Sequence, residues 1–232
     1  MTLARKLTIE FIGTFFLVFT VGMALATAGD LAPLAIGSVL MVMVFAGGHI
    51  SGGFYNPAVT LAVFLRGRLA AAEVAPYVVA QCVAGILGGL LVRGLGYNPA
   101  HALAVAGDGK MLVVELLFTF ALAYVVLNVA TSSDTANNSF YGLAIGFTLA
   151  VAAFAVGSVS GAAINPAVAL GGSVAGVFAW SHIWVYLIAE VVGGGAAAAV
   201  YMFTQPAAQP AQLAPTGVGT GMREVRAWPK AS

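Results

Sequence analysis

Six long apolar stretches alternate with short polar or glycine-rich segments along this chain. They cover about 8–28, 34–48, 74–95, 111–131, 140–157 and 181–203. A helix needs about 20 consecutive apolar residues to cross a bilayer, so each stretch is a candidate transmembrane helix. The second and fifth are short for a span, and each leads through a Gly/Ser-rich turn into a further apolar run. The pattern predicts six membrane-spanning helices and two shorter ones.

The apolar pattern belongs to an internal repeat. The tripeptide Asn56-Pro57-Ala58 recurs as Asn165-Pro166-Ala167, at an offset of 109 residues. The same offset joins the identical segments Leu34–Gly37 and Leu143–Gly146. Self-similarity at a fixed offset indicates copies of one structural unit. We therefore expect one transmembrane domain over 1–203, with repeat 1 at about 5–95 and repeat 2 at about 110–203.

Each repeated tripeptide is expected to begin a half-helix. Asn is a favoured N-cap and Pro suits the first helical position, which predicts half-helices at about Asn56–Leu65 and Asn165–Ala175. The segments His49–Tyr55 and Ser158–Ile164 before them are expected to be irregular, and irregular backbone at membrane depth must be buried or line a cavity. Three spans per repeat, an odd number, invert the second copy, so the two half-helix N-termini should face each other.

Composition and charge place this fold in a membrane. Hydrophobic residues make up 61% of the chain and charged residues only 7%, against about a quarter in soluble domains. Seven of the nine Lys and Arg residues fall on one side if both termini are cytoplasmic, as the positive-inside rule requires. We expect a multi-pass protein of the plasma or inner cell membrane. Residues 204–232 should form a disordered cytoplasmic tail.

Several polar residues stand inside the apolar pattern. Glu10 and Glu115 occupy matching places and are expected to accept hydrogen bonds from the irregular segments, since buried carboxylates in membranes need partners. His49 is expected to hydrogen-bond loop backbone rather than bind metal. Gln81 and its repeat mate Glu190 are interpreted as structural supports, with gating by protonation of Glu190 as the alternative.

These residues resemble the aquaporin, or major intrinsic protein, family in a prokaryotic-type form, over about residues 5–203. The matching segments are Glu10–Phe15, Gly48–Gly53 leading into Asn56–Thr60, Tyr77–Gln81, and the second Asn-Pro-Ala. The resemblance implies an all-α membrane protein of six transmembrane helices plus two re-entrant half-helices in an inverted repeat. It also implies one pore per subunit and a homotetramer in the lipid bilayer.

The resemblance also implies a selectivity constriction, whose four positions correspond here to Ile36, Ala153, Ala162 and Val168. The family's usual arginine after the second Asn-Pro-Ala is replaced by Val168. An apolar constriction favours water together with glycerol, urea or ammonia, with cation exclusion left to the two half-helix ends and to dehydration. The alternative is that loop backbone, or Phe54 and Tyr55, narrow the path elsewhere and keep it water-sized.

Other functions stay open or are disfavoured. Inverted repeats and broken helices also occur in secondary transporters, where Glu190 could bind a coupling proton. The missing arginine also leaves an ion-conducting member of the family open. We expect no enzyme activity, cofactor, bound metal or nucleic-acid partner, because no nucleophile–base pair, phosphate loop or metal-ligand cluster stands out. A third tripeptide, Asn98-Pro99-Ala100, has no repeat mate and is interpreted as a surface turn.

Overall fold

The computed structural model of the chain describes residues 1–97 and 102–205. Nearly all of the predicted tail, and the third Asn-Pro-Ala, lie outside these residues. Each repeat contains four helices in the same order. They are α1 (Leu3–Thr27), α2 (Ala32–Ser51), α3 (Pro57–Leu65) and α4 (Ala71–Gly94), followed by α5 (Asp108–Thr131), α6 (Tyr141–Ser160), α7 (Pro166–Val174) and α8 (Ile183–Thr204). Single 3-10 turns at Gly29–Leu31 and Trp180–His182 precede α2 and α8.

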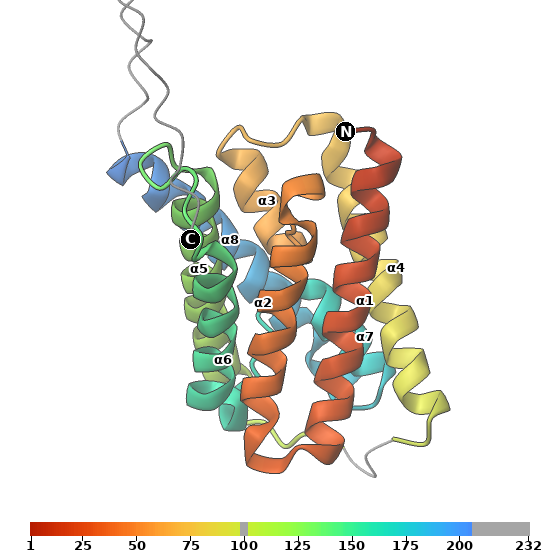
Figure 1. The fold of residues 1–232 in the computed structure, drawn as a ribbon. Coiled ribbons are helices and arrows are strands. Elements are labelled where there is room, and N and C mark those ends of the chain that lie inside the picture. The colour runs from red at the N-terminus through yellow and green to blue at the C-terminus, as the bar shows by residue number, and fades with distance from the viewer. Residues whose placement is uncertain (98–101, 206–232) are drawn as a thin grey trace, which may run out of the picture.

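The six longer helices are each long and apolar enough to cross a membrane. The protein is therefore an all-α, multi-pass membrane protein, as the hydrophobic pattern predicts. The start of α1 and the end of α8 lie at the same end of the bundle (Figure 1). The half-helices α3 and α7 enter the bundle from opposite ends and meet inside it (Figure 1).

One part of the sequence interpretation was wrong. The second and fifth spans are not too short to cross, because α2 and α6 each contain 20 residues and continue through Ser51 and Ser160. Each helix ends where a glycine takes a left-handed conformation, at Gly52 (φ 98°) and Gly161 (φ 88°). Glycine tolerates this conformation without steric cost. The irregular loops are consequently shorter than predicted, at 52–56 and 161–165.

The two repeats are interleaved rather than placed side by side. Helices α2 and α6 pack together, and each half-helix packs closely on the last long helix of the other repeat, α3 on α8 and α7 on α4. Glycines permit this approach: a Cβ atom on Gly194 would lie 2.6 Å from the Ala58 carbonyl oxygen, and one on Gly85 would lie 2.4 Å from that of Ala167. Small residues let helices approach closely in a membrane.

Candidate functional site

The two half-helices begin at the repeated asparagines. The Oδ1 atom of Asn56 accepts hydrogen bonds from the backbone N–H groups of Ala58 (2.8 Å) and Val59 (3.4 Å). The Oδ1 atom of Asn165 accepts one from Ala167 N–H (2.9 Å). Both asparagines are extended N-caps followed by proline. The N-cap prediction is thus confirmed at both half-helices, and a positive helix end, worth about half an elementary charge, faces the molecular centre from each side.

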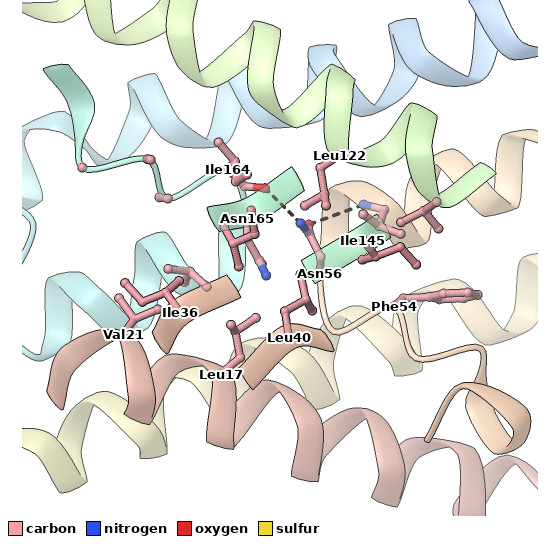
Figure 2. A pocket seen from close by; sticks show the side chains of 17 residues that line it. Leu17, Val21, Ile36, Leu40, Phe54, Asn56, Leu122, Ile145, Ile164 and Asn165 are labelled. Carbon is pink, nitrogen blue, oxygen red and sulfur yellow. Dashed lines mark hydrogen bonds between the residues drawn. The ribbon is translucent and has the colours of Figure 1, made fainter. Parts of the chain in front are cut away.

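The same asparagines also link the two repeats. The Nδ2 atom of Asn56 donates to the carbonyl oxygen of Ile164 at 2.9 Å, and Nδ2 of Asn165 donates to the carbonyl oxygen of Tyr55 at 2.8 Å. Figure 2 shows Asn56 and Asn165 close together, with a dashed line from the Ile164 carbonyl oxygen to Asn56. A side-chain amide has two N–H donors, so each asparagine keeps a second one for another acceptor.

The carbonyl groups that receive these bonds come from strained residues. Tyr55 and Ile164 have left-handed backbone, with φ of 49° and 40°. Such a conformation is a genuine outlier for a β-branched residue like Ile164 and costs of order 1–3 kcal/mol. The left-handed conformation points each carbonyl group toward the asparagine of the opposite loop. The surrounding hydrogen bonds therefore have to hold both loops in place.

Glu10 supports the first loop. This fully buried carboxylate accepts hydrogen bonds from the backbone N–H of Phe54 (3.0 Å) and Tyr55 (2.7 Å) and from the Ser51 hydroxyl (2.7 Å). Buried charges require such partners, because desolvation of an unpaired carboxylate is costly. The expected hydrogen bonds to loop backbone are therefore present.

Glu115 supports the second loop in the same way. It accepts from the backbone N–H of Ala163 (3.1 Å) and Ile164 (2.7 Å) and from the Ser160 hydroxyl (2.5 Å). Its side chain is also fully buried. These three partners of Glu115 match the serine and loop partners of Glu10, which shows that the repeat extends to the polar scaffold behind the loops.

Gln81 and Glu190 occupy equivalent places but make different hydrogen bonds. The Nε2 atom of Gln81 donates to Glu10 Oε2 and to Thr60 Oγ1, both at 2.9 Å. Oε1 of Glu190 accepts from the backbone N–H of Asn165 at 3.0 Å. Both side chains are fully buried behind the half-helices.

A narrow central cavity of about 20 Å³ lies between the two loops. A cavity of about 10–15 Å³ is enough for one water molecule, so this space holds about one at a time. Its polar side chains are those of Asn56 and Asn165, and the rest of the wall is mostly aliphatic (Figure 2). The wall residues are Leu17, Val21, Ile36, Leu40, Phe54, Val59, Leu122, Val126, Ile145, Leu149, Gly161, Ala162, Ala163, Ile164 and Val168.

Of the four expected constriction residues, Ile36, Ala162 and Val168 line this cavity. Ala153 is partly buried in α6 and is not among the lining residues. Sequence reasoning missed most of the aliphatic wall, although the repeat carried a signal for it. The missed lining residues are repeat mates, with Leu17/Leu122 and Val21/Val126 at offset 105 and Leu40/Leu149 at offset 109.

A wider cavity of about 660 Å³, here termed the vestibule, opens at the end of the bundle that holds the N-terminus. Lys6, His49 and Arg68 contribute to its wall. His49 is exposed there, and no hydrogen bond joins it to loop backbone within the part of the chain that the structure describes. Phe54 lines both the vestibule and the central cavity, so its ring stands where the two meet.

Phe178 in the second repeat makes the same kind of ring contact as Phe54, although it does not match Phe54 at the repeat offset. Phe54 lies against Tyr77, with ring centroids 5.5 Å apart, while Phe178 lies against Tyr186, the mate of Tyr77, at 5.2 Å. The residue that matches Phe54 at the repeat offset is the lining residue Ala163. The two ends of the central cavity are therefore unlike, with an aromatic ring at one and a methyl group at the other.

Among residues 1–97 and 102–205, no group of three or more His, Cys, Asp or Glu side chains could hold a metal ion.

Comparison with known proteins gives a consistent result. The family model described as major intrinsic protein matches residues 1–201. The chain is 39% identical over 203 residues to a glycerol uptake facilitator protein-like 6 of Lactiplantibacillus plantarum, covering 82% of this chain and 93% of that protein. It is 39% identical over 211 residues to nodulin-26 of Glycine max, covering 85% and 76%.

Among solved structures, the aquaglyceroporin of Plasmodium falciparum superposes with a TM-score of 0.73 at 22% identity, covering 86% of this chain and 96% of that one. At this identity the likeness shows a common fold.

Proposed function

The chain belongs to the major intrinsic protein family of membrane channels, and we propose that it carries water and small neutral solutes such as glycerol, urea or ammonia by passive diffusion. The observation that carries this proposal is the central cavity, in which each of the two asparagine amides keeps a second N–H donor between mostly aliphatic walls. A small hydroxylic or amide solute can exchange its water partners for these groups.

We propose that Ile36, Ala153, Ala162 and Val168 form the selectivity constriction. All four side chains are apolar, so they offer a passing solute neither a fixed charge nor a hydrogen-bond donor. A larger neutral solute therefore meets no charged or strongly polar filter when it enters this constriction. The central cavity nevertheless holds about one water, so larger solutes need the aliphatic wall to move, and water is expected to be the fastest permeant.

Cations should be excluded without an arginine. The N-termini of α3 and α7 present positive ends to the cavity, and no acidic side chain lines its wall to offset them. A cation would also have to lose most of its hydration in a space this narrow. This favours the neutral-solute channel over an ion-conducting one.

Glu190 also argues against coupled transport. Its carboxylate is bonded to the Asn165 backbone and stands behind the half-helix rather than on the cavity wall. A coupling site that binds substrate and ion together would need access to the permeation path.

We further propose that both termini are cytoplasmic, that the protein lies in the plasma or inner cell membrane, and that it forms a homotetramer with one pore per subunit. The distribution of Lys and Arg supports the orientation. In that orientation the vestibule faces the cytoplasm. Cross-linking of the protein in liposomes tests the tetramer.

Stopped-flow light scattering on proteoliposomes tests the function. Liposomes with the protein should respond to osmotic gradients faster than empty ones, and glycerol and urea gradients should relax measurably faster as well. The rates should not change when a proton or sodium gradient is imposed. Equal rates with and without protein would refute the channel, and a rate that depends on an ion gradient would favour the transporter.

A further inference from the structure

One buried carboxyl oxygen of Glu190 has no role in the proposed permeation path. The side chain is fully buried, and Oε1 accepts from Asn165 N–H at 3.0 Å. The second oxygen, Oε2, has no hydrogen-bond partner among the described residues. A buried polar atom without a partner costs about 1–3 kcal/mol, more if it is charged, so a fixed protein environment normally supplies one.

A second carboxylate stands beside it. Glu115 Oε2 accepts from Ile164 N–H at 2.7 Å, and Glu190 Oε1 accepts from the next N–H along the chain, that of Asn165. The two carboxyl groups therefore share one loop, since they accept from adjacent residues whose Cα atoms are only ~3.8 Å apart. Two carboxylates that share a buried site cannot both remain ionised at ordinary pH, because their repulsion adds to the cost of desolvation.

The first repeat shows what the second lacks. There, Gln81 donates a hydrogen bond from Nε2 to Glu10 Oε2, which gives Glu10 a donor beyond Ser51 and the loop N–H groups. In the second repeat, Glu190 replaces Gln81 and Ala169 replaces Thr60. An ionised glutamate has no donor to offer Glu115, whereas a protonated one has an O–H in the place of the glutamine N–H.

We infer that Glu190 is a neutral carboxylic acid that carries a proton on Oε2 and donates it toward Glu115, so that the two glutamates form a binding site for one proton beside Asn165. The proton supplies the donor that Gln81 provides in the first repeat. Glu190 acts as a positioning residue, because it contacts the backbone of Asn165 rather than the permeating solute.

Few other groups can influence this site. Of the helices that pack on α8, the half-helices α3 and α7 have no titratable side chains. On α5, Asp108 pairs with His182 near the start of the helix, seven residues or about 10 Å from Glu115, and Lys110 and Tyr124 are also more than one turn away. On α8 itself, Tyr186 lies one turn from Glu190 and donates its hydroxyl to the Ser160 carbonyl.

Loss of the proton should loosen the second loop. Two anions would then repel each other behind Ile164 and Asn165, the residues that exchange hydrogen bonds with the opposite loop. The folded state would hold one more proton than the unfolded chain, in which glutamate ionises near pH 4.3. Stability therefore falls as the pH rises, because the folded state keeps a proton that the unfolded chain has already released.

Infrared spectroscopy and thermal unfolding test the inference without reference to what the channel carries. At neutral pH the wild type should show the C=O band of a protonated carboxyl group, and Glu190→Gln should lose it. Glu73→Gln is the matched control, because Glu73 forms a salt bridge with Lys6 at 2.8 Å on a different helix from the acid pair, so its variant should keep the band. A wild type without the band, or a Glu190→Gln variant that retains it, would overturn the inference.

The unfolding temperature gives a second reading. As the pH rises above about 4.3, where glutamate ionises in the unfolded chain, this temperature should fall further in the wild type than in Glu190→Gln, which carries a permanent donor. Parallel pH profiles would count against a proton on Glu190. If Glu190→Gln does not fold, Gln81→Glu builds the same acid pair in the first repeat and should add a second acid band and a steeper pH profile. A Gln81→Glu variant with neither change would also overturn the inference.

Discussion

Asn56 lies in the first repeat and Ile164 in the second, yet the Asn56 side-chain amide donates to the Ile164 carbonyl oxygen at 2.9 Å. Asn165 and Tyr55 make the reciprocal bond at 2.8 Å. Each asparagine thus performs two tasks, because its Oδ1 atom caps a half-helix while its Nδ2 atom ties that half-helix to the opposite loop. The loop that precedes each pore asparagine therefore fixes the position of the other asparagine.

Replacement of Asn56 by aspartate separates these two tasks. Asn56→Asp keeps the capping oxygen but places a second oxygen against the Ile164 carbonyl. We expect the free energy of unfolding to fall by about 1–3 kcal/mol, since a buried acceptor loses its donor. Thermal unfolding in detergent measures this loss. Asn128→Asp is the control, because the Asn128 side-chain amide donates to the Tyr124 carbonyl one turn earlier in α5, and it should leave water permeability unchanged. Equal unfolding temperatures for Asn56→Asp and wild type would show that the cross-loop bond is dispensable.

Val168 offers a test of the apolar constriction. Val168→Arg introduces a charged, strongly hydrated group beside the central cavity, where Val168 is almost fully buried. We expect glycerol and urea permeability to fall roughly tenfold, which corresponds to about 1.4 kcal/mol in the barrier, while water is retained better. Stopped-flow light scattering gives all three rates. Val168→Leu adds volume without charge and serves as the control. A uniform loss for water, glycerol and urea would mean that the arginine merely blocks the path.

Phe54 should limit the size of the solute at the vestibule end. Phe54→Ala removes the ring that stands between the vestibule and the central cavity, so the ratio of glycerol to water permeability should rise. Phe178→Ala is a matched control, since Phe178 makes the equivalent contact with a tyrosine but does not line the cavity. It should lower stability by about 3–5 kcal/mol without a change in that ratio. The same increase in both variants would point to general loosening.

Two neighbouring glycines on α8 test the fit of the half-helix. A Cβ atom at Gly194 would lie 2.6 Å from the Ala58 carbonyl oxygen, whereas one at Gly195 meets nothing within 4 Å. Gly194→Ala should therefore displace α3 and cost about 1–3 kcal/mol, together with a loss of water permeability. Gly195→Ala should be neutral or stabilise the helix by up to about 1 kcal/mol. Similar unfolding temperatures for Gly194→Ala and Gly195→Ala would contradict the close packing of α3 on α8.

Much of the fold could be predicted because the repeat and the hydrophobic pattern are local signals. Asn-Pro is a strong helix start, and both half-helices begin where it predicts. The ends of α2 and α6 were harder, because the sequences after Gly48 and Gly157 resemble loops while Ser51 and Ser160 still continue the helix. The helices stop at the next glycine, which takes the left-handed conformation without steric cost.

The walls of the cavity could be predicted only in part. Residues next to a motif, such as Val168, are placed by the motif itself, whereas Leu17 and Leu122 depend on how α1 and α5 rotate about their own axes. The equivalence of Phe54 and Phe178 could not be predicted, because the second ring comes from after the half-helix and only tertiary packing brings it onto Tyr186. The partner of Glu190, a backbone N–H on another segment, is likewise invisible in the sequence.

The unlike ends of the central cavity have a consequence for inhibition. A passive pore must conduct a neutral solute equally in both directions under equal and opposite gradients, so Phe54 cannot make the flux one-way. A blocker is different, because it needs only to enter from one side and lodge. A bulky neutral molecule that arrives through the vestibule meets the Phe54 ring, while one that arrives from the other side meets Ala163. Such a blocker should therefore act from one face of the membrane more strongly than from the other.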